Sequence, residues 1–219
     1  MKMQDFGAEL AADRAKALQL TPVSRETEAR LDRFAELLIN WQKRINLVSP
    51  ATLPNLWTRH IADSLQLLML VEKPKLWIDL GSGGGFPGIV LACSLAEDPG
   101  AIVHLVESNQ KKASFLREAA RIPGAPARVH AMRIEDFVAE FPDTADVVSA
   151  RALAPLERLL AEAYPLLKNG VKGVFPKGQD VGSELTEAAK YWKFDHELIP
   201  SLTSPDGQIV VVRNVSKLA

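Results

Sequence analysis

Five glycines fall between positions 81 and 88, directly after an apolar run at residues 76–80, and they predict a backbone that approaches a ligand closely. Glycine accepts positive φ values and leaves free space beside the main chain, which suits a loop that wraps a nucleotide. A flexible turn is the simpler alternative. However, an apolar run, a glycine loop and a second apolar segment in succession are typical of a strand, a ligand-binding loop and a helix.

The residues around the glycines indicate which ligand this loop binds. The pattern Gly83-x-Gly85-x-x-Gly88 matches the dinucleotide motif GxGxxG in form. In the usual register, however, the first glycine follows the strand at once, and the third glycine is then replaced by Phe86. Asp79 lies two residues before the first glycine, where an anion would repel a pyrophosphate and attract an ammonium or sulfonium group. We therefore expect a cationic nucleoside rather than a dinucleotide.

Acidic residues follow the next two strand-like runs. Glu107 ends the second run, and a carboxylate there can accept both ribose hydroxyls of an adenosine. Helix capping is the alternative role, although Ser108 or Asn109 could cap that helix instead. Ile134 and Glu135 follow the third run, where backbone amides and an acidic side chain can read the amino edge of adenine.

Cations follow the fourth and fifth strand-like runs. Arg151 and Lys177 are therefore expected at the edge of the sheet where a donor and an acceptor would meet, and they are the candidates for a catalytic role. For Arg151, a buried structural ion pair is the alternative.

A polar cluster lies upstream, in the segment Arg59-His60-x-x-Asp63-Ser64. On a helix, His60, Asp63 and Ser64 share one face. Either the cluster docks this helix on the main domain, or it places Arg59 or His60 near the substrate.

Hydrophobic periodicity places these residues on an α/β scaffold. One amphipathic helix ends before Asn46, and a second is expected from about Leu56 to Val71. From position 74, strands and helices alternate in the order βαβαβ(α)βαβαββ, with a hairpin turn at residues 204–207. We expect a helical extension at residues 1–73 packed on a domain at residues 74–219.

Composition excludes several classes of protein. The 26 basic and 27 acidic residues leave a net charge of −1, so no overall basicity indicates nucleic acid, although a basic face remains possible. The absence of a long apolar run predicts no membrane span, and the acidic N-terminal stretch does not resemble a secretory signal. The single cysteine, Cys93, excludes an internal disulfide and agrees with a cytoplasmic protein. Four scattered histidines argue against a metal site.

Four stretches together resemble the RsmG (GidB) family of bacterial 16S rRNA guanine-N7 methyltransferases. They are NWQKRINLVS at 40–49, RHIADS at 59–64, DLGSGGGFPGIVLA at 79–92, and SARALAPL at 149–156 with KGQ at 177–179. The resemblance covers about residues 30–215. It implies the Rossmann-like fold of class I S-adenosylmethionine-dependent methyltransferases, in which a seven-stranded, mostly parallel sheet has an antiparallel last strand.

The same resemblance implies S-adenosylmethionine as methyl donor and N7 of a guanine, at position 527 in the decoding-region loop of 16S rRNA, as acceptor. It places donor contacts at Gly81, Phe86, Ile134-Glu135 and Arg151. Phe86 stands where relatives often carry Leu, and Glu107 where they often carry Asp; both changes keep the expected chemistry. Guanine N7 carries a lone pair and no proton, so methylation there needs no general base, and alignment of the reactants is the expected source of catalysis.

We expect 16S rRNA or the small ribosomal subunit as the partner of a monomeric protein that needs no metal. Two other readings remain open: a small-molecule methyltransferase with a helical lid, and a non-catalytic ribosome-binding protein. RNA would contact a basic rim, for which the candidates are Arg59, Lys111, Lys112, Arg117, Arg151, Lys177 and Arg213.

Overall fold

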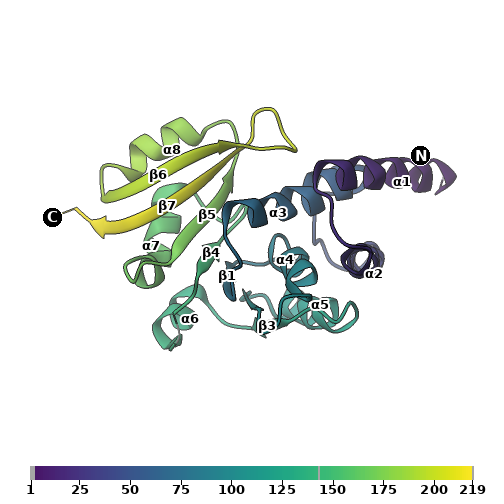
Figure 1. Cartoon of the computed structure of the whole chain (residues 1–219), viewed down its shortest axis with the longest axis horizontal. Coiled ribbons are helices and arrows are strands. Elements are labelled where there is room, and N and C mark those ends of the chain that lie inside the picture. The colour runs from purple at the N-terminus through teal and green to yellow at the C-terminus, as the bar shows by residue number, and fades with distance from the viewer. Residues whose placement is uncertain (1–2, 143, 219) are drawn as a thin grey trace.

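A seven-stranded sheet forms the centre of the computed structural model, which describes residues 3–142 and 144–218 (Figure 1). The strand order is β3-β2-β1-β4-β5-β7-β6. Strands β1 to β5 are parallel to one another, and β7 runs antiparallel to β5 and β6. This arrangement confirms the predicted fold class. The strands are β1 (Leu76–Leu80), β2 (Ile102–Val106), β3 (Ala127–His130), β4 (Val147–Ser149), β5 (Lys172–Lys177), β6 (Trp192–Pro200) and β7 (Gln208–Lys217).

Alternate residues of the central strands face two separate hydrophobic clusters, because side chains of a strand point to opposite faces in turn. Trp77 belongs to one cluster and its neighbour Ile78 to the other. The first cluster includes residues of α4 (Gly88–Leu95) and α5 (Gln110–Arg121), and the second includes residues of α6 (Ile134–Glu140), α7 (Leu156–Leu167) and α8 (Val181–Ala188). Helices therefore cover both faces of the sheet, and the carboxyl ends of the parallel strands remain available to a ligand.

The N-terminal segment shares the first cluster with the sheet. It comprises α1 (Met3–Leu20), α2 (Arg25–Gln42), η1 (Pro50–Asn55), η2 (Trp57–Ala62), α3 (Asp63–Leu65) and η3 (Gln66–Leu70). Phe34 of α2 lies 5.3 Å from Phe86 and 6.4 Å from Phe115 between ring centroids. The division at residues 73 and 74 thus separates two segments that share a core, and it stays a prediction.

The segment at residues 56–71 differs from the single helix expected there. It consists of a π-helical turn, a short α-helical turn and a 3-10 turn in succession. Asp13 accepts hydrogen bonds from the backbone N–H groups of Trp57 and Thr58, and the hydroxyl of Ser64 donates to the carbonyl of His60. Such bonds from side chains to the backbone compete with the regular α-helical pattern, and π-helical turns occur often at functional sites.

Candidate active site at the carboxyl ends of β1, β4 and β5

The glycine loop follows β1 and bends back over the end of β2. The N–H groups of Gly81 and Ser82 both donate to the carbonyl of Val106, at 2.9 and 3.0 Å. Gly81 and Gly83 have φ values of +69° and +52°, in the left-handed region that favours glycine. A Cβ added to Gly83 would meet no atom closer than 3.7 Å, so the loop leaves open space on this side for a ligand.

Asp79 does not present its charge to that space, contrary to our expectation from the sequence. Its side chain is buried, and its two carboxylate oxygens accept hydrogen bonds from the Ser149 hydroxyl and the N–H of Gly88. Burial raises the pKa of Asp79 to about 6, against the opposing effect of these hydrogen bonds. The carboxylate therefore fastens β1 to β4 and to the start of α4.

Glu107 lies beside the glycine loop at the end of β2, as predicted. Oε2 accepts from the N–H of Gly83 at 3.0 Å, and Oε1 accepts from the N–H of Asn109 at 2.8 Å. Asn109 itself caps α5, because its side chain accepts from the N–H groups of Lys111 and Lys112. Glu107 therefore does not cap α5. Each of its oxygens keeps a further lone pair for a hydroxyl group.

Ile134 and Glu135 are the first two residues of α6, which follows the end of β3. The residue before them, Arg133, makes no side-chain hydrogen bond to the start of this helix. The arrangement agrees with backbone contacts to a ligand at the edge of the sheet, although the contact itself stays a prediction.

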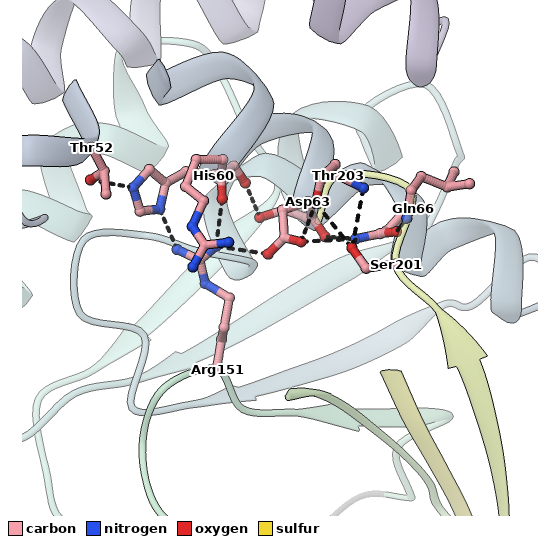
Figure 2. Close-up of polar contacts among 10 residues, drawn as sticks. Thr52, His60, Asp63, Gln66, Arg151, Ser201 and Thr203 are labelled. Carbon is pink, nitrogen blue, oxygen red and sulfur yellow. Dashed lines mark hydrogen bonds and ion pairs between the residues drawn. The ribbon is translucent and has the colours of Figure 1, made fainter. Parts of the chain in front are cut away.

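Arg151 points into the N-terminal segment (Figure 2). Nη1 lies 2.9 Å from Oδ2 of Asp63, and Nη2 lies 2.5 Å from Nδ1 of His60. The guanidinium also covers the ring of Phe86 at 5.3 Å from its centroid, and the His60 ring lies 4.9 Å from the same ring. Arg151 therefore forms the ion pair that was the alternative to a catalytic role, and it does so beside the candidate site.

His60 is held neutral by this arrangement. Burial, and then the positive charges of Arg151 and Arg59, lower the pKa of His60 to about 3. Because Nδ1 accepts from Arg151, Nε2 carries the proton and donates to the Thr52 hydroxyl at 2.8 Å, and Thr52 donates in turn to the carbonyl of Ser49. The polar cluster predicted at residues 59–64 does dock the segment, and it also borders the site.

The residues directly after Arg151 contact the glycine loop. Ala152 has a φ value of +52°, and a Cβ placed on Gly81 would lie 2.8 Å from Cδ1 of Leu153. The Leu153 side chain therefore rests against the backbone at Gly81. Nothing in the sequence pattern distinguishes Leu153 from an ordinary apolar residue, so its position was not predicted.

The same segment lines a cleft of about 700 Å³. Its walls come from residues 151–155, residues 176–179 and the β6–β7 turn at 201–209, together with Arg59, His60 and Asp63. Of the predicted site residues, Arg151 and Lys177 line the cleft, whereas Gly81, Phe86, Glu107, Ile134 and Glu135 do not. The predicted residues therefore form two groups. Gly81, Phe86, Glu107, Ile134 and Glu135, here called the cradle, lie in the glycine loop or after the ends of β2 and β3, and Arg151 and Lys177 line the neighbouring cleft.

Lys177 lines the cleft with its charge already paired. Its ammonium lies 2.7 Å from Oε2 of Glu184 and donates to the carbonyl of Ala154 at 2.7 Å. Its side chain is only 7% exposed. Of the other predicted RNA contacts, Arg59, Lys111, Arg117 and Arg213 are exposed. Lys112 is half-buried.

The residues present fit an adenosine-type methyl donor. A glycine loop with open space and a carboxylate at the end of β2 are what a nucleoside with a ribose requires. Among the described residues, no three His, Cys, Asp or Glu side chains are grouped to hold a metal ion. Within the same part of the chain, no helix has the length and apolar character to span a membrane.

Comparison with known proteins identifies the family. The GidB model, described as rRNA small subunit methyltransferase G, matches residues 27–210. The chain belongs to this family. A Bradyrhizobium sp. (strain BTAi1) protein named ribosomal RNA small subunit methyltransferase G is 61% identical over 203 residues, covering 93% of this chain and 91% of that protein. A Rhodopseudomonas palustris (strain BisB18) protein of the same name is 60% identical, covering 92% and 86%.

Solved structures of methyltransferases share the fold of this GidB family member. A putative O-methyltransferase from Klebsiella pneumoniae superposes with a TM-score of 0.61 at 14% identity, covering 93% of this chain and 96% of that one. An O-methyltransferase from Bacillus cereus, solved in complex with SAH, gives 0.59 at 16% identity, covering 95% and 100%. At these identities the likeness supports the class I methyltransferase fold alone.

Proposed function

We propose that this protein transfers the methyl group of S-adenosylmethionine to N7 of a guanine in 16S rRNA, acting as a cytoplasmic monomer without a metal ion. The observation that carries the proposal is the placement of residues 151–155. Leu153 rests on the glycine loop, while residues 151–155 line the neighbouring cleft. One segment therefore borders both the proposed donor site and the proposed acceptor site, and a direct transfer between two substrates requires the two sites to adjoin.

The donor would be held by residues of the cradle. The backbone at Gly81 and Gly83 would approach it closely, the free lone pairs of Glu107 would accept its ribose hydroxyls, and Phe86 and the backbone at Ile134 and Glu135 would border it. When bound, S-adenosylmethionine supplies an electrophilic methyl group, so that the N7 lone pair forms the new bond to carbon while the carbon–sulfur bond breaks and its electron pair stays on sulfur.

The acceptor would enter the cleft beside Arg151. The titratable side chains around Arg151 are already engaged, because His60 accepts from Arg151 and Asp63 is ion-paired with it. Glu184, on the opposite wall, is paired with Lys177. Transfer to guanine N7 needs no general base, because that nitrogen has no proton to lose. The chain would accelerate the reaction by holding N7 in line with the methyl group.

RNA binding would use exposed cations, both at the cleft and away from it. Arg59 lines the cleft, and Lys111, Arg117 and Arg213 are exposed elsewhere. Contacts of these groups with phosphates would release counterions, so affinity should fall as salt concentration rises. A small metabolite in a closed pocket would not show this dependence.

The test uses 16S rRNA from a strain that lacks the gene. Borohydride reduction and aniline cleavage report N7-methylguanine, and the strain should lose one such site that the purified protein restores on small ribosomal subunits or naked rRNA. Retention of every N7-methylguanine in the deletion strain would remove the proposal. Failure of the purified protein to bind S-adenosylmethionine would favour a non-catalytic ribosome-binding role instead.

A further inference from the structure

We propose that Asp63 is a positioning residue for Arg151, and that it sets the separation of the two walls of the acceptor cleft. The proposal rests on the function proposed above. It concerns a residue of the cleft wall whose two carboxylate oxygens are already engaged by other side chains, and which would act through them.

The Asp63 carboxylate joins three segments that lie far apart in the sequence (Figure 2). Oδ2 accepts from Nη1 of Arg151 at 2.9 Å, at the end of β4. Oδ1 accepts from the hydroxyl of Thr203 at 2.7 Å, in the β6–β7 turn, and from Nε2 of Gln66 at 2.9 Å. Because each oxygen serves a different wall of the cleft, a movement of the carboxylate would move both walls.

Gln66 strengthens the connection to the β6–β7 turn. Its side chain is buried, with Nε2 3.2 Å from the Ser201 hydroxyl and Oε1 accepting from the N–H of Leu202 at 2.8 Å. The Ser201 and Thr203 hydroxyls lie 3.1 Å apart. Residues 63 and 66 thus hold the turn through its backbone and its side chains, and this turn supplies Ser201, Ser204, Asp206 and Gly207 to the cleft.

The ion pair with Arg151 differs from the other ion pairs of the N-terminal segment by its burial. The side chains of Arg151 and Asp63 are 17% and 15% exposed, whereas those of Arg14 and Asp32 are 32% and 41% exposed. Low exposure to water strengthens the attraction and fixes its geometry. An ion pair that served only to dock the segment could lie at the surface, as the pair of Arg14 and Asp32 does.

Arg151 needs Asp63 for its direction as well as for its charge. Nη1 also donates to the carbonyl of Arg59 at 3.2 Å, and Nη2 donates to His60. Without the Asp63 charge, these neutral acceptors would hold the guanidinium less firmly and would leave its charge uncompensated beside the cleft. The segment at 152–155 follows Arg151 directly, so its contact with Gly81 would shift too.

A double-mutant cycle tests the proposal, with two readouts: the Kd of S-adenosylmethionine from calorimetry and the initial rate of methyl transfer. In the wild-type background, Asp63→Asn should weaken donor binding about tenfold and lower kcat about a hundredfold, as a displaced reactive geometry does. In an Arg151→Ala background, the same substitution should change either quantity by no more than about twofold, because residues that act through one another are not additive.

Equal losses in both backgrounds would overturn the proposal, since Asp63 would then act without Arg151. Thr203→Val is the matched control: it removes one partner of the same carboxylate, leaves the Arg151 ion pair, and should not change donor affinity. If Asp63→Asn does not fold, Asp63→Glu keeps the charge and displaces the carboxylate in the same cycle, and wild-type behaviour of that variant would also overturn the proposal. If the wild type binds the donor but methylates no rRNA, the proposed function fails while the Kd readout still decides the role of Asp63.

Discussion

The hydroxyl of Ser149 donates a hydrogen bond to the buried carboxylate of Asp79 across the neighbouring strands β1 and β4, with 3.0 Å between Oγ and Oδ1. The indole N–H of Trp77 donates to the same hydroxyl at 2.9 Å. This chain of hydrogen bonds fixes the end of β1 from which the glycine loop departs. It explains why an acidic residue is placed there although it does not face the loop's ligand.

We expect Asp79 to make the stability of the protein depend on pH in the acidic range. Burial raises the pKa of Asp79 from 3.8 to about 6, so the folded state holds this proton more tightly than the unfolded state. The contribution to stability is present in full below pH 4 or so and is lost as the pH rises to about 6. Relative to Asp79→Asn, the wild-type free energy of unfolding should fall by about 3 kcal/mol in total as the pH rises from well below 4 to well above 6.

Urea unfolding of both proteins across this pH range measures the difference. The Asn variant loses one hydrogen bond at every pH, because its amide cannot accept from both Ser149 and Gly88. The two proteins are therefore compared by how their free energies of unfolding change with pH, and not by the absolute values. If the free energies of unfolding of the two proteins change with pH in parallel, the Asp79 carboxylate has the same pKa in the folded and the unfolded state.

Gly81→Ala should weaken S-adenosylmethionine binding at least tenfold. The new Cβ would lie 2.8 Å from Cδ1 of Leu153, in a residue with a φ value of +69° that L side chains rarely adopt. Calorimetry gives the affinity, and thermal unfolding gives the cost to the fold. Gly100→Ala is the control, because Gly100 has a φ value of +80° and open space around it. If both variants bind S-adenosylmethionine equally well, the donor site does not include Gly81.

The sequence predicted the parts of the site that follow from strand order. Glu107 and Arg151 follow the ends of β2 and β4, and Lys177 ends β5; parallel strands bring their carboxyl ends to one edge of the sheet. Asn109 was one of two expected caps for α5 and is the residue that serves.

The sequence did not predict contacts between segments that are distant along the chain. The hairpin signal at residues 204–207 indicated a turn, but not that Thr203 reaches Asp63, 140 residues away. Asp79 was assigned to a ligand because its position suits a cation, whereas burial and two hydrogen-bond donors from the fold determine its role. Periodicity reports which face of an element is apolar, and it does not report which polar groups meet.

His60 should remain neutral across the physiological range, with its proton on Nε2. Its pKa of about 3 follows from burial and from two neighbouring arginines, and Nδ1 is engaged with Arg151. Two-bond ¹H–¹⁵N correlations of the ring should show a protonated Nε2 and a bare Nδ1, without titration between pH 8 and about 5. A pattern with both nitrogens protonated would contradict the hydrogen-bond chain to Thr52.

The same shift predicts a loss of stability in acid. The unfolded state gains a proton on His60 below pH 6.5 or so, whereas the folded state does not until the pH reaches about 3. The free energy of unfolding should therefore decrease as the pH is lowered from about 6.5 to about 3. The part of this decrease that is due to His60 should be missing in His60→Gln. Chemical unfolding of wild type and variant at a series of pH values measures that part, which opposes the effect of Asp79 in sign.

Lys177→Met should destabilise the protein by about 2 kcal/mol, because it removes one partner of a buried ion pair. We expect its loss of activity to follow from this loss of stability and not from the loss of a catalytic cation. The substitution leaves the carboxylate of Glu184 and the carbonyl of Ala154 without the ammonium that both contact at 2.7 Å. The second substitution Glu184→Gln removes the unpaired charge and keeps an oxygen for the N–H of Leu156, which donates to Glu184 in the wild type.

The double variant Lys177→Met/Glu184→Gln should therefore recover at least half of the lost stability, and with it most of the methyl transfer. Thermal unfolding and initial rates on the same preparations give the two quantities. If the double variant regains stability while its rate stays as low as that of Lys177→Met, the ammonium itself takes part in the reaction, and the position of Lys177 at the end of β5 is catalytic.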